Sequence, residues 1–396
     1  MILRSALLVT LLAACGTKEE PADCSTRPIA LPSGRGELTG EWDAEHGRMV
    51  LFAGNQGVPV DCATTATDFV GETWVFQTDC DSFAQVKSAR APHKRGRYAT
   101  ALDAAHHRML LFGGRFRDGD SGSYKMYDDL WAFDFDSDTW TELPSGNKRP
   151  SARVNFSMEV AGDALYLFGG NDSADGASPT YLADTWKYDL SAGTWSDVTK
   201  AKAPQGRVWA ASATDGSAMY LYGGGGGLVG PFFSDLWKLD GATGAWEKLH
   251  GEADAPRERF WANLEWDDAG KRLLMFGGHD NTDLGNSNDL WAYDPAADAW
   301  TPLREGDTFN KPANGQCDFP PDFTVVDTES PERRNAAAST FTDDGVMLVF
   351  GGKTDCGVIN DVWGFSVKDE AWTDRSTATM GESCLRSSAS CTGLCF

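Results

Sequence analysis

One short pattern of residues occurs six times along this chain of 396 residues. In each copy a short hydrophobic run ends in an aromatic residue and two glycines, or a close variant, and an acidic residue two positions before a tryptophan follows. A second aromatic residue lies nine positions after that tryptophan in every copy. The gap between the glycines and the first tryptophan varies, so one loop carries the variation. Such a repeat indicates one structural unit stacked on copies of itself.

The six copies are aligned by their glycines and by their aromatic pairs. The glycine signals are Leu51-Phe52-Ala53-Gly54, Phe112-Gly113-Gly114, Phe168-Gly169-Gly170, Tyr222-Gly223-Gly224, Phe276-Gly277-Gly278 and Phe350-Gly351-Gly352. The aromatic pairs are Trp74/Phe83, Trp131/Trp140, Trp186/Trp195, Trp237/Trp246, Trp291/Trp300 and Trp363/Trp372. An arginine precedes the hydrophobic run of each copy, and the first and last copies depart most from the pattern, as terminal repeats do.

Each copy predicts four short strands, which we call A to D. In the third copy they are Arg153–Val160, Ala164–Phe168, Thr185–Tyr188 and Thr194–Val198, separated by Gly, Asp and Ser clusters. Short aromatic and β-branched runs between such clusters are typical of strands joined by tight turns. A four-stranded sheet cannot cover both of its own faces, and stacking such sheets radially gives a β-propeller. The sequence therefore predicts an all-β fold, a six-bladed β-propeller with four antiparallel strands per blade.

The arginine at the head of strand A, the two glycines after strand B and the aromatic pair around the C–D turn resemble the Kelch repeat. The resemblance covers roughly Arg35 to Arg375, and we expect the propeller domain at residues 27–375, with blades at 35–86, 97–143, 153–198, 207–249, 259–303 and 334–375. Residues 27–31 resemble the end of a D strand, so we expect them to add to the sheet where blades one and six meet. Propellers host binding modules and enzymes alike, so this resemblance specifies the fold and not the function.

The N-terminus has the features of an export signal. Residues 1–14 contain a basic start and a short apolar run, and Leu12-Ala13-Ala14-Cys15 resembles a bacterial lipobox. This predicts an exported lipoprotein of the bacterial outer membrane, with lipid on Cys15 and a polar tether over residues 15–26. The membrane would be contacted through the lipid only. The alternative is an ordinary signal peptide, with Cys15 left in the mature chain.

Eight of the nine cysteines remain if Cys15 carries lipid, and an even number in an exported chain favours disulfides. Cys317 and Cys356 both fall in loops on one face of the propeller, which predicts that they pair. Cys62–Cys80 is the local choice in blade one, and a bond from Cys62 to the Cys-containing C-terminal tail (376–396) remains open.

The net charge of −23 opposes binding to nucleic acid and to anionic lipid. No metal motif occurs, and Asp118-Gly119-Asp120 and Asp280-Asn281-Thr282-Asp283 are weak calcium candidates. Three of the six histidines (His46, His106 and His107) fall in predicted A–B turns, and no motif implies a cofactor.

The variable loops, and the face of the propeller that carries them, are where we expect a ligand. In Kelch adaptors of animal cells the arginine that heads strand A and the residue after the glycines line the central pocket. By this resemblance the candidate ligand-binding residues are Arg97, Arg115, Arg153, Asn171, Arg207, Arg259, His279, Arg334 and Lys353. Such a ring of cations suits a carboxylate or another anionic group. The alternative is that these arginines pair with the acidic residue before each C-strand tryptophan.

Two functions follow as expectations. The first is a non-catalytic binding module in the cell envelope for a protein or carbohydrate ligand. The second is a metal-independent sugar-modifying enzyme that resembles the six-bladed sialic-acid mutarotase, with Glu258 and His279 as acid–base candidates. No catalytic motif identifies a reaction, so no catalytic residue is assigned and the binding module is preferred. The identity of the ligand does not follow from the sequence.

Overall fold

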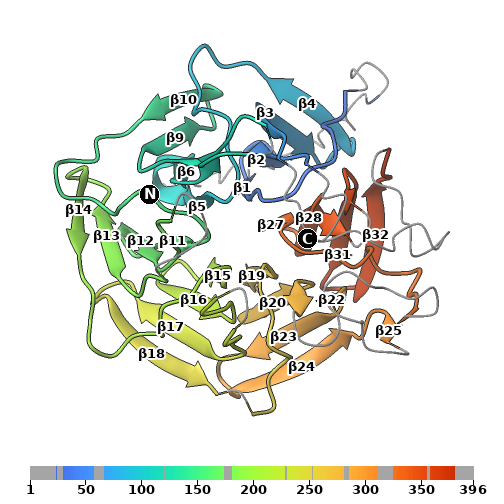
Figure 1. Cartoon of the computed structure of the whole chain (residues 1–396). Coiled ribbons are helices and arrows are strands. Elements are labelled where there is room, and N and C mark those ends of the chain that lie inside the picture. Colours follow the sequence, from blue (N-terminus) through green and yellow to red (C-terminus); the bar gives the residue numbers. More distant parts are fainter. Residues whose placement is uncertain are drawn as a thin grey trace, which may run out of the picture.

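The protein is described by a computed structural model that covers residue 24 and residues 30–57, 67–119, 121–173, 181–227, 230–251, 253–280, 285–309, 324–354 and 357–379. Six four-stranded antiparallel sheets form a ring, which confirms the predicted six-bladed propeller (Figure 1). The strands β1, β5, β11, β15, β19 and β27 lie innermost, and β4, β10, β14, β18, β24 and β32 lie at the rim. Blades one and six lie side by side, so consecutive packing closes the ring.

The strand bounds follow the predicted A-to-D pattern. Blade one has β1 (Gly40–Asp43), β2 (Arg48–Asn55), β3 (Phe69–Gln77) and β4 (Ser82–Val86). Blade two has β5 (Ala99–Asp103), β6 (Arg108–Phe112), β9 (Leu130–Asp134) and β10 (Thr139–Glu142). Blade three has β11 (Ser157–Ala161), β12 (Ala164–Phe168), β13 (Thr185–Asp189) and β14 (Thr194–Asp197).

The other three blades repeat this order. Blade four has β15 (Ala211–Thr214), β16 (Ala218–Tyr222), β17 (Leu236–Asp240) and β18 (Ala245–His250). Blade five has β19 (Asn263–Asp267), β20 (Arg272–Phe276), β23 (Leu290–Asp294) and β24 (Ala299–Arg304). Blade six has β27 (Ala338–Phe341), β28 (Val346–Phe350), β31 (Val362–Ser366) and β32 (Ala371–Ser376).

Short elements decorate this frame. The two-residue pairs are β7 (Arg115–Phe116) with β8 (Lys125–Met126), β21 (His279–Asp280) with β22 (Gly285–Asn286), β25 (Thr308–Phe309) with β26 (Thr324–Val325), and β29 (Lys353–Thr354) with β30 (Gly357–Val358). A 3₁₀ turn, η2, covers Ala104–His106. Within the described residues no helix is long and apolar enough to cross a membrane. We call the side that carries the B–C loops the loop face and the side that carries the A–B and C–D turns the turn face.

The double glycines join each blade to the next. The second glycine has a positive φ, and its N–H donates to the carbonyl of the arginine that precedes the next A strand. These bonds are Gly54–Arg95, Gly114–Arg153, Gly170–Arg207, Gly224–Arg259, Gly278–Arg334 and Gly352–Arg35. A Cβ on the first glycine would meet the same carbonyl, at 2.8 Å for Gly113 and Arg153. The pattern therefore specifies close contact between blades, and the last of the six bonds closes the ring.

A second ring of backbone hydrogen bonds surrounds the axis two residues after each of these arginines. All six of its residues have a positive φ, although none is glycine. They are Glu37, Arg97, Asn155, Trp209, Trp261 and Ala336. The N–H of each residue donates to the carbonyl of the equivalent residue in the preceding blade, at 2.9–3.2 Å. The N–H of Glu37 in blade one donates to the carbonyl of Ala336 in blade six. This unusual backbone conformation positions six side chains around one opening on the loop face.

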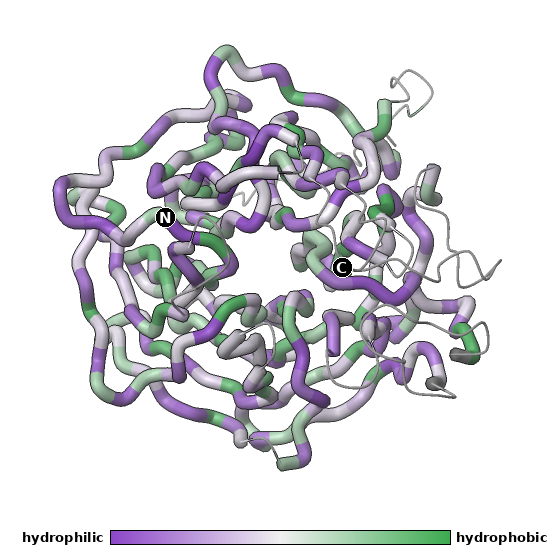
Figure 2. The backbone as a smooth tube through the Cα atoms, in the orientation of Figure 1, coloured by the Kyte–Doolittle hydropathy of each residue, from purple (hydrophilic) through white to green (hydrophobic). Residues whose placement is uncertain are grey.

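The core is divided between neighbouring blades and has no single centre. The D-strand aromatic ring of one blade packs on the B-strand aromatic ring of its neighbour. Phe52 and Trp140 lie 4.9 Å apart between ring centroids, and Phe276 and Trp372 also lie 4.9 Å apart. Hydrophobic and hydrophilic stretches accordingly alternate around the whole ring (Figure 2). The D-strand aromatic residue of the repeat thus packs in the interface between two blades, where its ring buries apolar area.

Three expectations need correction or limits. The arginine of blade two that matches the repeat is Arg95 and not Arg97, because Arg95 binds Gly113 as the others bind their first glycine. Residues 30–31 form no strand, so the predicted sheet addition is wrong for them, and residues 27–29 lie outside the described residues. Cys80 is bonded to Cys24 and not to Cys62.

The physical reason for the different disulfide is position on the blade. Cys80 lies in the C–D turn on the turn face, after the end of β3, whereas Cys62 precedes β3 in the sequence. Cys15, Cys62, Cys317 and Cys356 lie outside the described residues, as do residues 1–23 and 380–396.

Candidate functional site

Six arginines, one before each A strand, bind the acidic residue that precedes the C-strand tryptophan. The pairs are Arg35–Glu72, Arg95–Asp129, Arg153–Asp184, Arg207–Asp235, Arg259–Asp289 and Arg334–Asp361. In blade three, Arg153 donates to both oxygens of Asp184 at 2.8 Å and to the carbonyl of Gly169 at 2.9 Å. The indole N–H of Trp186 donates to the same carboxylate at 2.6 Å. The repeat therefore encodes a buried polar network.

This network removes four residues from the predicted ligand site. Arg153, Arg207, Arg259 and Arg334 are at most 4% exposed. The alternative expectation, a structural pairing with acidic residues, is confirmed for them. Their charges are neutralised and their N–H groups donate to protein oxygens. A buried guanidinium without such partners would destabilise the fold, so these contacts serve stability.

Arg97 takes a different position because it belongs to the ring of backbone hydrogen bonds. Its guanidinium donates to the carboxylate of Glu37 at 3.0 Å, and the ammonium of Lys353 binds the same oxygen at 2.7 Å. Glu37 and Lys353 are 4% exposed. Arg97 also lies 4.9 Å from the centroid of the Trp261 ring, within the range of a cation–π contact. Two of the predicted residues thus meet on a carboxylate that the sequence did not single out.

Arg115 completes this group, which we call the mouth cluster (Glu37, Arg97, Arg115, Lys353 and Trp261). Its guanidinium carbon lies 3.7 Å from the centroid of the Tyr124 ring, and its buried Nε has no hydrogen-bond partner among the described residues. Burial and the nearby charge of Arg97 lower the pKa of Arg115 to about 9. Although burial opposes ionisation of Glu37, the charges of Arg97, Lys353 and Arg115 hold its pKa well below the usual value.

The mouth cluster therefore holds three cations around one carboxylate. Burial lowers the pKa of Lys353, and the charge of Glu37 partly opposes that change. With all of these groups ionised, the cluster has an excess of two positive charges. An anionic group that entered it would gain charge-assisted hydrogen bonds in a partly desolvated site.

The last two predicted residues have separate positions. Asn171 forms backbone bridges with Val154 and Tyr181, and its Oδ1 is buried without a hydrogen-bond partner in the described part of the chain. His279 is buried, with Nδ1 2.9 Å from Asn286 Oδ1 and its ring 5.0 Å from that of Phe260. Neither residue belongs to the mouth cluster, and His279 is part of the packing of blade five.

A cavity of about 440 Å³ lies along the propeller axis, below the opening on the loop face. Glu37, Arg97, Asn155, Trp209 and Trp261 line its loop-face end. Asn155 Oδ1 and Trp209 Nε1 are buried without hydrogen-bond partners in the region that the structure describes. The cavity wall thus offers an acceptor and a donor, beside a cationic rim, to a polar ligand.

Three glutamates line the same cavity further along the A strands. They belong to the odd-numbered blades and are Glu41 (β1), Glu159 (β11) and Glu265 (β19). Each accepts a hydrogen bond from a hydroxyl of the following even-numbered blade. The pairs are Thr100–Glu41 (2.7 Å), Ser212–Glu159 (2.8 Å) and Ser339–Glu265. The result is a ring in which three carboxyl groups alternate with three hydroxyls, which we call the carboxyl ring.

Burial dominates the ionisation of the carboxyl ring. It raises the pKa of Glu41 from 4.5 to about 7 and that of Glu265 to about 8, although the hydroxyl hydrogen bonds oppose the change. Burial and the negative charges of Glu41 and Glu265 raise the pKa of Glu159 well above its usual value. Near neutral pH the ring therefore holds protons that ordinary surface glutamates have lost, and these groups both donate and accept hydrogen bonds.

The sequence contains a signal for this ring outside the six-fold motif. Glu41, Glu159 and Glu265 each lie six residues after the structural arginine of their blade, at Arg35, Arg153 and Arg259. Even-numbered blades lack a glutamate there. An alignment of alternate repeats would have found this period of two blades. When blade two is aligned on Arg97 in place of Arg95, the recurrence of the glutamate in alternate blades is obscured. The distinct position of Arg97 is obscured as well.

Comparison with known proteins agrees with this architecture. Residues 44–267 and 199–317 match the KLHDC2/KLHL20/DRC7 Kelch-repeats domain. The chain is 27% identical over 253 residues to N-(sulfonatooxy)prop-2-enimidothioate sulfolyase of Thlaspi arvense, covering 58% of this chain and 68% of the relative. It is 23% identical over 307 residues to human Kelch domain-containing protein 10 (75% of this chain, 63% of the relative). It is 27% identical over 239 residues to human Kelch domain-containing protein 3 (57% and 58%).

These matches span only about three fifths to two thirds of each relative, so they identify a domain and not a shared activity. One of the relatives is named as an enzyme and two are named by their domain alone. The family match covers more than half of the chain, whose described residues form six four-stranded blades. The chain therefore belongs to the Kelch-repeat family.

Proposed function

We propose that this propeller is a binding module that receives an anionic group of a protein or carbohydrate ligand in the mouth cluster. The observation that carries this proposal is the excess of positive charge in the mouth cluster, where Arg97, Arg115 and Lys353 surround the one carboxylate of Glu37. The net charge of the whole protein is −23. An acidic protein that concentrates positive charge at the opening of a cavity can steer an anion to that point.

Arg115 gives the proposal its sharpest support. Its side chain is half-buried and has a cation–π contact with Tyr124, and its buried Nε makes no hydrogen bond within the described residues. A buried guanidinium loses hydration, and this loss is compensated when an anion binds. Asn155 and Trp209 offer further contacts on the cavity wall for the polar groups of a sugar or a peptide.

We propose further that the module acts in the cell envelope, anchored by lipid on Cys15, and that it does not bind nucleic acid. The disulfide between Cys24 and Cys80 supports export, because such bonds persist in oxidising compartments. The strongly acidic composition opposes association with polyanions.

The carboxyl ring supports a second candidate, acid–base chemistry on a bound sugar without a metal. A carboxyl group whose pKa lies near 7, such as Glu41, can both donate and accept a proton at physiological pH. Turnover of a bound sugar, measured as interconversion of its anomers, would support this candidate. Saturable binding without turnover supports the module.

The experiment uses the soluble propeller without its tether and an array of sialylated, uronate-containing and neutral glycans together with acidic and neutral peptides. We expect Arg115→Gln to abolish retention of the acidic probes. It should weaken binding by about 2–5 kcal/mol if the guanidinium pairs with a desolvated anion. Because the buried Nε of Arg115 has no hydrogen-bond partner among the described residues, the melting temperature should stay at or above that of the wild type.

Arg149→Gln is the matched control. Arg149 is an exposed arginine whose partner is Asp128, so its loss removes the same charge away from the cavity. Equal loss of binding in the two variants would attribute retention to net charge alone and would refute the mouth cluster as the site.

A further inference from the structure

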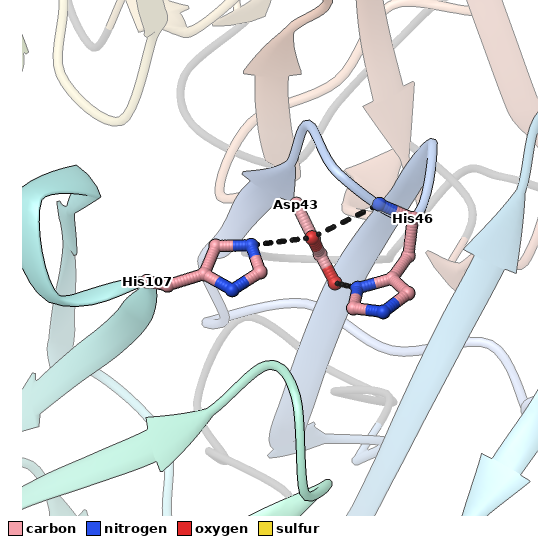
Figure 3. Close-up of side chains that lie close together, drawn as sticks. All are labelled: Asp43, His46 and His107. Atoms are coloured by element: carbon pink, nitrogen blue, oxygen red, sulfur yellow. Dashed lines mark hydrogen bonds and ion pairs between the residues drawn. The ribbon is translucent and has the colours of Figure 1, made fainter.

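Two histidines and one aspartate from neighbouring blades converge on the turn face, away from the mouth cluster. Asp43 ends β1, His46 lies in the β1–β2 turn, and His107 follows η2 in the β5–β6 turn of blade two. Both imidazole rings point toward the Asp43 carboxylate (Figure 3). Nδ1 of His46 lies 2.8 Å from Asp43 Oδ2, and Nε2 of His107 lies 3.3 Å from Asp43 Oδ1. One ligand atom from each residue lies within 4.8 Å of the others.

His107 is held in one orientation. Its backbone has a φ of 51°, its carbonyl accepts from Phe135, and its Nδ1 lies 2.9 Å from Asp136 Oδ1. A hydrogen bond from Nδ1 to a carboxylate places the proton of a neutral imidazole on that nitrogen and leaves the lone pair on Nε2. Carboxylate–histidine pairs of this kind orient the histidine ligands of metal ions.

The Nε2 lone pair of His107 has no suitable partner in the described structure. The atom is buried and makes no hydrogen bond, and the nearest polar atoms are carboxylate oxygens, of Asp43 at 3.3 Å and of Glu45 at 3.7 Å. A lone pair that faces a carboxylate is unfavourable, and a cation between the two atoms reverses the interaction. A buried nitrogen that makes no hydrogen bond and faces two carboxylates among the described residues therefore points to a cation as its ligand.

The surrounding charges also favour a cation. Arg48 donates to Asp43 Oδ2 at 2.7 Å and also binds Asp138. The described residues around the two rings therefore hold the carboxylates of Asp43, Glu45, Asp136 and Asp138 against the one guanidinium of Arg48. With neutral imidazoles, the cluster is negative.

The donor set selects the class of metal. Two imidazole nitrogens and one carboxylate oxygen are ligands of Zn²⁺ and of similar divalent transition ions, and not of Ca²⁺ or Mg²⁺. Tetrahedral zinc with bonds of about 2.0–2.2 Å places its ligand atoms roughly 3.3 Å apart. The separation of His107 Nε2 and Asp43 Oδ1 is already 3.3 Å.

We propose that Asp43, His46 and His107 bind a zinc ion that links the A–B turns of blades one and two. Asp136 is a positioning residue, because it contacts His107 on the nitrogen that faces away from the metal. Glu45, whose carboxylate lies 3.7 Å from His107 Nε2, is within reach of the fourth coordination position.

Blade two contains a natural control for this site. Asp103 and His106 repeat the spacing of Asp43 and His46, with Nδ1 of His106 2.9 Å from Asp103 and Arg108 bound to the same carboxylate. The next A–B turn, in blade three, has Gly162 and Asp163 and offers no imidazole. No group of three metal-binding side chains includes Asp103 or His106 among the described residues. The same local motif is therefore present without the contribution from a second blade.

The test measures zinc bound to the full chain after metal removal, by calorimetric titration with Zn²⁺ and by elemental analysis of the dialysed protein. We expect one zinc per chain and a melting temperature that rises with added zinc, since a ligand of the folded state stabilises it. His46→Gln and His107→Gln should abolish stoichiometric binding, and Asp136→Asn should weaken it roughly 10–100-fold. His106→Gln should bind zinc as the wild type does.

Cobalt provides a readout that does not depend on stability. Absorption bands of tetrahedral Co²⁺ should appear in the wild type and in His106→Gln and should be lost in His107→Gln. Absence of bound metal in the wild type, or equal loss in His106→Gln and His107→Gln, would overturn the proposal. In the first case, Nε2 of His107 would carry a proton that satisfies the contact with Asp43, and no metal ion would be needed there.

Discussion

The backbone N–H of Glu37 donates a 3.0 Å hydrogen bond to the carbonyl of Ala336 and so joins blade one to blade six. The bond closes a circle in which every blade contributes one residue with a positive φ. The same residue carries the carboxylate that collects Arg97 and Lys353. Closure of the ring and assembly of the mouth cluster therefore depend on one backbone position.

Gly351→Ala should destabilise this closure. The new Cβ would lie 2.8 Å from the carbonyl oxygen of Arg35, at a position whose φ is 65°. We expect the free energy of unfolding to fall by about 2–4 kcal/mol in urea titrations, because backbone strain and a collision act together. Gly216→Ala is the control, since its φ is also positive but no atom lies within 4 Å of its Cβ. It should cost about 1 kcal/mol, and an equal effect of the two substitutions would contradict the close contact between blades.

Arg153→Gln should destabilise the fold without affecting ligand binding. The change leaves the carboxylate of Asp184 and the carbonyl of Gly169 without their main partner, in a place where Arg153 is 1% exposed. We expect a loss of about 3–5 kcal/mol in unfolding free energy. Arg153→Lys, which keeps the charge but not the two-pronged geometry, should lose less. Reduced affinity per folded molecule would return Arg153 to the binding site.

The carboxyl ring should make stability depend on pH. Glu41 and Glu265 hold their protons up to pKa values of about 7 and 8, whereas the unfolded chain releases them near 4.5. Between these values the folded state binds more protons than the unfolded state, so the free energy of unfolding should fall as pH rises from about 5 to 8. Glu265→Gln should flatten this slope and should be more stable than wild type by about 1–3 kcal/mol at pH 8. Glu247→Gln, on the exposed side of β18, is the control. A wild type whose stability does not change over this range would contradict burial of these groups.

Cys24→Ser and Cys80→Ser should have equal effects. The disulfide joins two cysteines that are 56 positions apart in the sequence. Its loss should lower the free energy of unfolding by about 2–4 kcal/mol. Peptide mapping of the unreduced protein should recover Cys24 linked to Cys80. Recovery of a Cys62–Cys80 peptide would restore the pairing expected from the sequence.

Cys15→Ser tests the proposed lipid anchor. We expect the wild type to partition with membranes after expression in a Gram-negative host, and the variant to accumulate as a precursor or a soluble form. Cys62→Ser controls for the loss of a cysteine elsewhere. Membrane partitioning of Cys15→Ser equal to that of the wild type would refute acylation at this residue.

The repeated residues were sufficient to predict the blades. Phe168-Gly169-Gly170 and the pair Trp186/Trp195 mark the ends of strands and turns, because each reflects a local need: a positive φ, a buried ring or a tight connection. The family followed from the same residues. The alternative pairing of Arg153 with Asp184 was also visible, since both belong to one repeat.

Contacts between blades were decided only by the tertiary structure. Lys353 meets Glu37 across 316 positions of sequence, and His107 meets Asp43 from the next blade. A repeat pattern states which strand a residue occupies, but the number of blades and the closure of the ring determine which side chains share the axis or a turn. Three of the nine predicted ligand residues, Arg97, Arg115 and Lys353, therefore came together, whereas the carboxyl ring and the Asp43 cluster emerged only when the six blades closed on one another.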